Sequence, residues 1–191
     1  ELLTQAGLAE DAIDRMLGGS SRVITVTAHR RESFGEPFEQ MLLAMRDIVD
    51  VHSDVEIVYP VHPNPNVREA AARILSSTER IHLLEPLRYE QLLFLMDHST
   101  LLLTDSGGIQ EEGPSLRKPV LVMREVTERP EGIEAGVARL VGTDRKRIVD
   151  TVHTLLTDSK EYDAMATGIN PYGDGTASKK IADILLESLH A

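Results

Sequence analysis

The residues best suited to chemistry in this sequence lie in a small-residue turn between an apolar run and a candidate helix. The run Leu101-Leu102-Leu103 is followed by Thr104-Asp-Ser-Gly-Gly-Ile-Gln-Glu-Glu112, a pattern that predicts a buried strand, a glycine bend and a helix start. The unpaired N–H groups and the positive dipole end of a first helical turn bind anions. Gly107 and Gly108 have no Cβ to keep a phosphate away. We interpret the turn as a phosphate site, because two or three hydrogen bonds of roughly 1.5–3 kcal/mol each would anchor the ligand.

A carboxylate follows this turn at a spacing that suits a nucleotide. Glu112 comes four residues after Gly108, about 6 Å further along the same helical face. A carboxylate only accepts hydrogen bonds, so it suits a pair of sugar hydroxyls beyond the phosphate. Phosphate donors followed by a diol acceptor match the order of groups in a nucleotide. The simpler alternative is that Ser106 is only an N-cap and Glu112 a solvated helix residue.

Other polar residues also come directly after apolar runs that are typical of strands. Guanidinium groups are bidentate phosphate partners, and a nearby phosphate raises the pKa of a histidine toward its protonated donor form. The imidazole and guanidinium groups among these residues would therefore suit a diphosphate. In chain order the polar residues are His29, Arg30 and Arg31, then His62, then Glu85, and finally Arg124 with Glu128 and Arg129 in the same loop.

Each of these residues has a structural alternative. His29 could serve only as a hydrogen-bonding group at a strand end, Arg30 and Arg31 could be an exposed pair, and His62 could brace the rigid loop before Pro63. His29 and His62 are not expected to bind a metal, because no third ligand has a matching spacing. The remaining histidines are assigned no chemistry, since they lie within a predicted strand or on predicted helices: His82, His98, His153 and His190.

An alternation of strands and helices positions these groups. Strands are expected at residues 22–28, 55–59, 80–84, 101–104, 119–123 and 137–141. Short apolar strands that alternate with amphipathic helices predict a parallel sheet joined by right-handed crossovers. We therefore expect an α/β fold, a Rossmann-like open parallel sheet of about six strands with helices on both faces. Ligands bind beyond the carboxyl ends of such strands, so the polar groups would meet at one edge.

The helices are predicted from apolar residues at helical spacing. Pro37 suits a helix start, and Pro114 should kink or interrupt the helix that follows the glycine turn. Further helices are expected at residues 8–17, 67–75 and 145–156. The helix that begins near Pro37 has a predicted apolar face of Phe38, Met41, Leu42, Met45 and Val49. The helix before the strand at 101–104 has a predicted face of Tyr89, Leu92, Leu93 and Met96. The C-terminal helix follows a turn-rich loop at 168–175 and has a predicted face of Ile181, Ile184, Leu185 and Leu189.

Composition excludes several classes of function. The 191 residues include 20 basic and 31 acidic side chains, a net charge of −11, which argues against a general nucleic-acid binder. There are no cysteines, so disulfides, thiolate metal sites and a cysteine nucleophile are excluded, and a reducing compartment is expected. Apolar runs reach about five residues, far short of the roughly 20 of a membrane helix, and no signal peptide is recognised. Because the first residue is Glu1, we expect a processed chain or a fragment of a longer one.

Five stretches in order along the chain resemble the C-terminal half of the non-hydrolysing UDP-N-acetylglucosamine 2-epimerases. The first of these stretches departs from the family pattern at Ser33, where family members often have asparagine. The stretches are Val26-Thr-Ala-His29-Arg30-Arg31-Glu32-Ser33-Phe-Gly35, Pro60-Val-His62-Pro63-Asn64-Pro65, residues 104–112, Pro119-Val-Leu-Val-Met-Arg124-Glu-Val-Thr-Glu-Arg-Pro130 and Asn170-Pro-Tyr-Gly-Asp-Gly175.

The resemblance implies one half of a two-domain GT-B-type fold, with the nucleotide sugar in the cleft between two Rossmann-like halves. Residues 1–20 would be a leading helix and linker, 21–167 the UDP-binding domain, and 168–191 a crossover loop and helix that pack on a missing N-terminal domain. By this resemblance, Ser106, Gly107 and Gly108 would bind the diphosphate, Glu112 the ribose, and Arg129 the phosphate end of the ligand. His29 would be the catalytic residue. Arg30 and His62 would line a regulatory UDP-sugar site.

The resemblance further implies a cytoplasmic isomerase that acts in cell-surface polysaccharide biosynthesis and is a homodimer at full length. It would interconvert UDP-N-acetylglucosamine and UDP-N-acetylmannosamine by UDP elimination and re-addition, with no cofactor or metal and no nucleic-acid or membrane partner. The catalytic carboxylates would lie outside this chain, so the chain alone should bind UDP weakly and be inactive. Alternatives are the UDP-sugar-binding half of a GT-B glycosyltransferase, a hydrolysing relative, and a non-catalytic nucleotide-sugar sensor.

Overall fold

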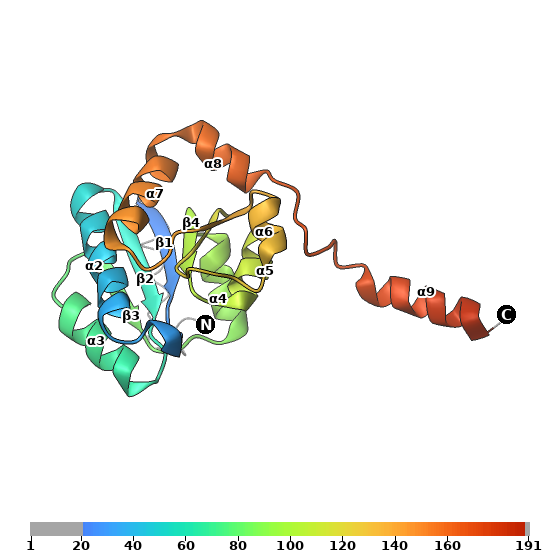
Figure 1. Ribbon diagram of the computed structural model, residues 1–191, viewed down its shortest axis with the longest axis horizontal. Coiled ribbons are helices and arrows are strands. Elements are labelled where there is room, and N and C mark those ends of the chain that lie inside the picture. The colour runs from blue at the N-terminus through green and yellow to red at the C-terminus, as the bar shows by residue number, and fades with distance from the viewer. Residues whose placement is uncertain (1–20, 190–191) are drawn as a thin grey trace.

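The strands form one open, entirely parallel sheet in the computed structural model, which describes residues 21–189 (Figure 1). The sheet order is β3-β2-β1-β4-β5-β6, so the chain starts in the middle, moves to one side and then crosses to the other. This confirms the predicted α/β fold with six parallel strands. The strands are β1 Arg22–Thr27, β2 Val55–Pro60, β3 Ile81–Leu84, β4 Leu101–Thr104, β5 Val120–Val122 and β6 Ala138–Leu140.

Helices cover both faces of the sheet, as predicted. On one face, α2 (Glu36–Val51), α3 (Pro65–Leu75) and α7 (Arg145–Thr157) pack on side chains of β1, β2 and β4. On the other face, a smaller apolar cluster joins α4 (Tyr89–Asp97), α5 (Gly107–Ser115) and α6 (Pro130–Glu134) to β4, β5 and β6. Because every residue of β4 is buried, this strand lies between both layers.

The starts of the main helices follow from local sequence. Gly35 takes a positive φ of 91° directly before α2, and a proline stands in the first turn of that helix, where its missing N–H costs nothing. The side chains of Asn64 and Asp144 accept hydrogen bonds from first-turn N–H groups of α3 and α7, which satisfies donors that have no intrahelical partner. The five predicted apolar residues of α2 are all buried, which confirms its predicted face.

Some predicted details are wrong or incomplete. The apolar face of α4 was predicted to include Tyr89, but this side chain is 59% exposed, whereas Gln91 and Leu95 are buried. Pro114 does not kink a long helix, because α5 ends at Ser115, one residue after it. Three elements were not predicted: the 3-10 helix η2 (Arg31–Ser33), α6, and α8 (Ser159–Ala166). The helix predicted at residues 8–17 lies outside the described residues.

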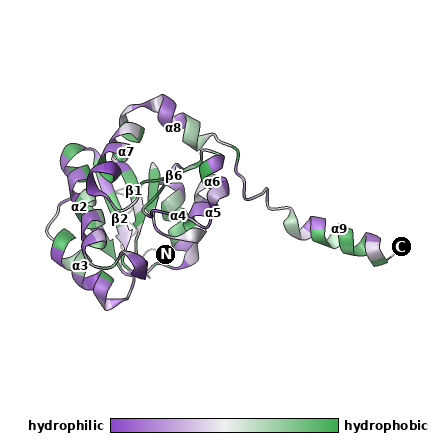
Figure 2. Ribbon diagram, viewed as in Figure 1, coloured by the Kyte–Doolittle hydropathy of each residue, from purple (hydrophilic) through white to green (hydrophobic). Residues whose placement is uncertain are grey.

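The last helix, α9 (Ala177–Leu189), lies apart from the rest of the domain (Figure 1). It follows the loop predicted at residues 168–175 and buries none of its residues. The apolar colour along α9 in Figure 2 belongs to side chains that are more than half exposed. No helix within residues 21–189 is long and apolar enough to cross a membrane. The side chains of this apolar face are Ile181, Ile184, Leu185, Leu186 and Leu189.

Candidate functional site

The site is built where β1 and β4 end side by side. Thr27 and Thr104 are register partners, and their hydroxyl groups lie 2.5 Å apart. The N–H of Asp105 then donates to the carbonyl of Thr27 at 3.0 Å. This pairing fixes the loop after β1, which carries His29, against the glycine turn after β4.

Asp105 ties these two loops together. It is fully buried, and its Oδ2 accepts hydrogen bonds from the backbone N–H groups of His29 at 2.6 Å and Arg30 at 2.7 Å. Its Oδ1 lies 3.2 Å from His29 Nδ1 but has no well-aligned hydrogen-bond partner. These two atoms are therefore in contact without an aligned hydrogen bond. The sequence analysis missed Asp105, although an acidic residue directly after a buried strand is the signal that could have found it.

His29 and His62 form a stacked pair at this edge. Their ring centroids are 5.1 Å apart and the ring planes are inclined by 8°. His62 Nδ1 accepts a hydrogen bond from the backbone N–H of Asn64 at 3.1 Å, so the proton of the neutral ring belongs on Nε2. His29 Nδ1 faces a carboxylate, which only accepts, so its proton belongs on Nδ1. In the neutral pair, His62 thus presents an Nε2–H donor and His29 an Nε2 without a proton.

A pocket of about 200 Å³ opens beside the two histidines. One wall is apolar and comes from the loop after β3 and from α4 and α5, and the other wall carries polar groups. Such a combination suits a flat ring that has a polar substituent. The sequence analysis did not assign the apolar wall to any site. The apolar residues of the pocket include Pro86, Leu87, Leu92 and Ile109, and its polar ones include His29, His62 and Ser106.

The N-terminus of α5 is open toward this edge. The Ser106 N–H donates to the Thr104 hydroxyl at 2.9 Å, which fixes the bend, but the Ser106 side chain does not cap the helix. A Cβ on Gly108 would meet no atom closer than the Ser106 hydroxyl oxygen at 3.9 Å. The turn therefore leaves room beside Gly108, whereas a Cβ on Gly107 would meet Glu128 Oε1 at 3.3 Å.

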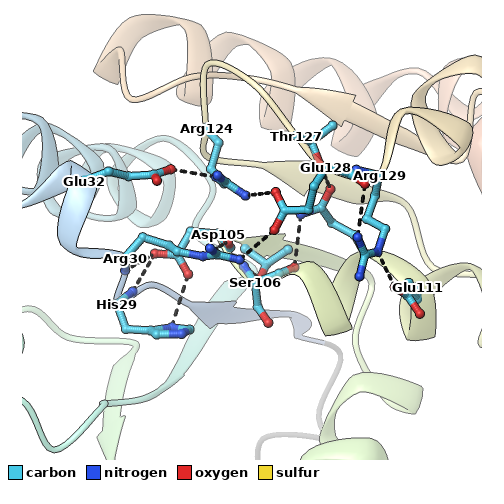
Figure 3. A network of polar contacts seen from close by, with 12 residues as sticks. His29, Arg30, Glu32, Asp105, Ser106, Glu111, Arg124, Thr127, Glu128 and Arg129 are labelled. Carbon is cyan, nitrogen blue, oxygen red and sulfur yellow. Dashed lines mark hydrogen bonds and ion pairs between the residues drawn. The ribbon is translucent and has the colours of Figure 1, made fainter.

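A network of arginines and glutamates borders the turn (Figure 3). Glu128 Oε1 accepts from Arg30 Nη2 at 3.0 Å, and Glu128 Oε2 accepts from Arg124 Nη1. Arg124 is buried and also donates to Glu32 at 2.7 Å. The pKa of Glu128 is lowered to about 2, first by its own backbone N–H and then by Arg124 and Arg30.

Arg129 and Glu112 lie on the side of the turn formed by α5 and its neighbouring loop. Arg129 donates to Glu111 on α5 and to the carbonyl of Glu128, so it is already paired. Glu112 makes no hydrogen bond or ion pair within the described part of the chain. Burial raises the pKa of Glu112, and the adjacent Glu111 raises it further.

The strand order and the glycine turn after β4 define a Rossmann-like α/β domain with its candidate site at the carboxyl ends of the strands. The sequence model for the UDP-N-acetylglucosamine 2-epimerase family matches residues 2–186. The chain therefore belongs to this family, which confirms the resemblance seen in its motifs.

Individual relatives agree with the family match. The UDP-N-acetylglucosamine 2-epimerase of Escherichia coli K12 is 56% identical over 164 residues, which is 86% of this chain and 44% of the relative. The structure of Staphylococcus aureus MnaA with UDP superposes with a TM-score of 0.89 at 43% identity, covering 95% of this chain and 50% of that one. The Neisseria meningitidis epimerase bound to UDP-GlcNAc gives a TM-score of 0.84 at 42% identity, covering 92% and 49%. The chain spans about half the length of the relatives it matches.

Proposed function

We propose that this chain is the nucleotide-binding half of a longer enzyme that interconverts UDP-N-acetylglucosamine and UDP-N-acetylmannosamine. The observation that carries the proposal is the uncapped N-terminus of α5 at Ser106, beside His29 and Arg30. Family membership and the relatives' structures with UDP and UDP-GlcNAc support the choice of nucleotide.

The nucleotide would lie along α5. The diphosphate would bind to Ser106, Gly107 and Gly108, where N–H groups and the helix dipole favour an anion. Glu112 would accept the ribose hydroxyls, and Arg129 would release Glu111 to reach the phosphate end of the ligand. The apolar wall of the pocket beside the histidines would hold the uracil ring.

The reaction would proceed by elimination and re-addition. A base removes the C2 proton of the sugar and the bond between C1 and the phosphate oxygen breaks. UDP is released, and the sugar becomes a glycal with a double bond between C1 and C2. UDP then re-forms the C1 bond while a proton is added to the opposite face of C2. In its imidazolium form, with a proton on each ring nitrogen, His29 would stabilise or protonate the departing phosphate through Nε2–H, and Asp105 would lie behind the ring at Nδ1.

The remaining parts of the enzyme would lie outside this chain. The carboxylates that move the C2 proton would belong to the missing half, so the 191-residue chain would bind UDP weakly and would not epimerise alone. Residues 168–191 would cross to that half. Arg30 and His62 would form a regulatory UDP-sugar site directly against the catalytic one, since His62 stacks on His29. The longer protein would be a cytoplasmic homodimer.

The test is an assay of the longer protein with UDP-N-acetylglucosamine and no acceptor. We expect UDP-N-acetylmannosamine to form, and we expect His29→Ala to slow elimination in a single turnover. An unchanged C2 with sugar transfer to an added acceptor would indicate a glycosyltransferase instead. Release of free N-acetylmannosamine would indicate a hydrolysing enzyme, and binding without any turnover would indicate a sensor.

A further inference from the structure

The Glu128 carboxylate lies beside Gly107, the residue at which α5 begins. Its Oε1 is 3.3 Å from the position that a Cβ on Gly107 would occupy. The guanidinium of Arg30 approaches the same point to 3.7 Å. Gly107 is the first residue of α5, so a carboxylate of this chain already faces the dipole end of the helix that would attract a phosphate.

Glu128 also binds both arginines nearest to this place. It accepts from Arg30 at 3.0 Å and from Arg124, and Figure 3 shows it between the two guanidinium groups. Neither arginine depends on it for position. Arg30 Nε donates to the carbonyl of Asp105 at 3.2 Å, and Arg124 Nε donates to Glu32 at 2.7 Å. Loss of the Glu128 charge would therefore leave both guanidiniums in place.

The Glu128 side chain can be displaced. It is 43% exposed, whereas Arg124 is only 8% exposed, so the carboxylate is free to rotate while that arginine is not. At neutral pH the carboxylate is charged, since its pKa is about 2. A phosphate that approaches α5 consequently meets a negative charge that can move aside and two arginines that this charge pairs.

We propose that Glu128 competes internally for the phosphate site. It pairs with Arg30 in the free protein, and this ion pair breaks when a nucleoside diphosphate binds. This inference rests on the proposed function. Glu128 lowers the affinity for phosphate-bearing ligands and leaves recognition of the nucleoside unaffected.

The proposal is tested by titrating the 191-residue chain and its Glu128→Gln variant with UDP in a calorimeter and with uridine by NMR. Glu128→Gln should bind UDP roughly three- to tenfold more tightly, because a like charge is removed a few ångströms from the ligand. The gain should shrink at high salt, and uridine, which has no phosphate, should show no gain. Glu128→Ala should change UDP affinity in the same direction.

Glu161→Gln is the matched control. Glu161 pairs with Arg139 at 2.9 Å on α8, a helix that Tyr162 links to Thr100 at the opposite end of β4, so UDP affinity should stay at the wild-type value. Equal or weaker UDP binding by folded Glu128 variants, or an equal gain for uridine, would overturn the inference and leave the proposed function standing. UDP binding by neither the wild type nor the variants would overturn both.

Discussion

Asp105 lies directly behind His29, with its Oδ2 2.6 Å from the backbone nitrogen and its Oδ1 3.2 Å from the ring Nδ1 of that histidine. One buried carboxylate thus fixes the loop through its backbone hydrogen bonds and faces the ring at Nδ1. Because Nδ1 faces an acceptor, Nε2 is left to face a ligand, as in other sites where a carboxylate orients a histidine.

Replacing Asp105 by asparagine should change the protonated nitrogen of His29. The amide oxygen can keep the hydrogen bonds to the backbone of His29 and Arg30, while its NH2 group would face Nδ1 as a donor. We expect the proton of the neutral ring to move from Nδ1 to Nε2, at a stability cost of about 1–3 kcal/mol. Nitrogen NMR of the ring and denaturant unfolding measure the two effects. Retention of the Nδ1–H form would show that Asp105 does not orient the ring.

Gly113→Ala should destabilise the domain by overpacking. A Cβ at Gly113 would stand 2.5 Å from Val120 Cγ2 and 2.8 Å from Leu102 Cδ1, both on buried strands. Overpacking of this kind costs about 1–3 kcal/mol. Gly108→Ala is the control, because a Cβ there would lie 3.9 Å from the Ser106 hydroxyl oxygen, so its stability should not fall below the wild-type value. Equal unfolding midpoints for the two variants would contradict this account of the close contact between α5 and the sheet.

His52 should make stability fall as the solution becomes acidic. It joins the end of α2 to α7, with Nε2 3.2 Å from His153 Nδ1. Burial lowers the pKa of His52, with further lowering from His153 and Arg22 and an opposing contribution from Asp54. The folded pKa therefore lies below the unfolded value of 6.5, and below that pH the unfolded state binds more protons.

The stabilisation contributed by neutral His52 is thus complete above the unfolded pKa and is lost as the pH falls toward the folded one. His52→Gln should lose less unfolding free energy than the wild type between about pH 7.5 and about pH 5.5, the range in which histidine titrates. Denaturant unfolding at the two pH values measures this. An identical pH dependence in both proteins would exclude His52 as the source.

The apolar face of α9 should matter only in the longer protein. Leu185 is 58% exposed, so Leu185→Glu should leave the thermal unfolding of the 191-residue chain unchanged. If α9 packs on the missing half, the same change should destabilise the longer protein, since a charge would be buried without a partner. Lys179→Glu on the same helix serves as a control for charge alone. An equal change in the unfolding temperature of the 191-residue chain and of the longer protein would argue against this packing.

The strands and the glycine turn were predictable because β-branched runs, turn residues and helical spacing are local signals. The exposure of Tyr89 and the burial of Gln91 on α4 were not predictable, since the orientation of this helix depends on tertiary packing. The buried Gln91 Oε1 accepts a hydrogen bond from the Arg88 backbone N–H. Helix α8 was missed because only Met165 of it is buried, although Asp158 caps it as a recognisable signal. The link between Asp105 and His29 spans 76 residues, a separation over which sequence spacing carries no information about contact.

The most direct test of the central claim is calorimetric titration of this chain with UDP, beside the double variant Ser106→Ala/Glu112→Ala. Ser106 lies at the start of α5 and Glu112 lies within it. Neither side chain caps the helix or forms an ion pair within the described residues. The double variant should therefore have the same unfolding free energy as the wild type. We predict weak UDP binding by the wild type and none by the double variant. Wild-type affinity in the double variant would place the nucleotide elsewhere and contradict the assignment of α5 as the UDP site.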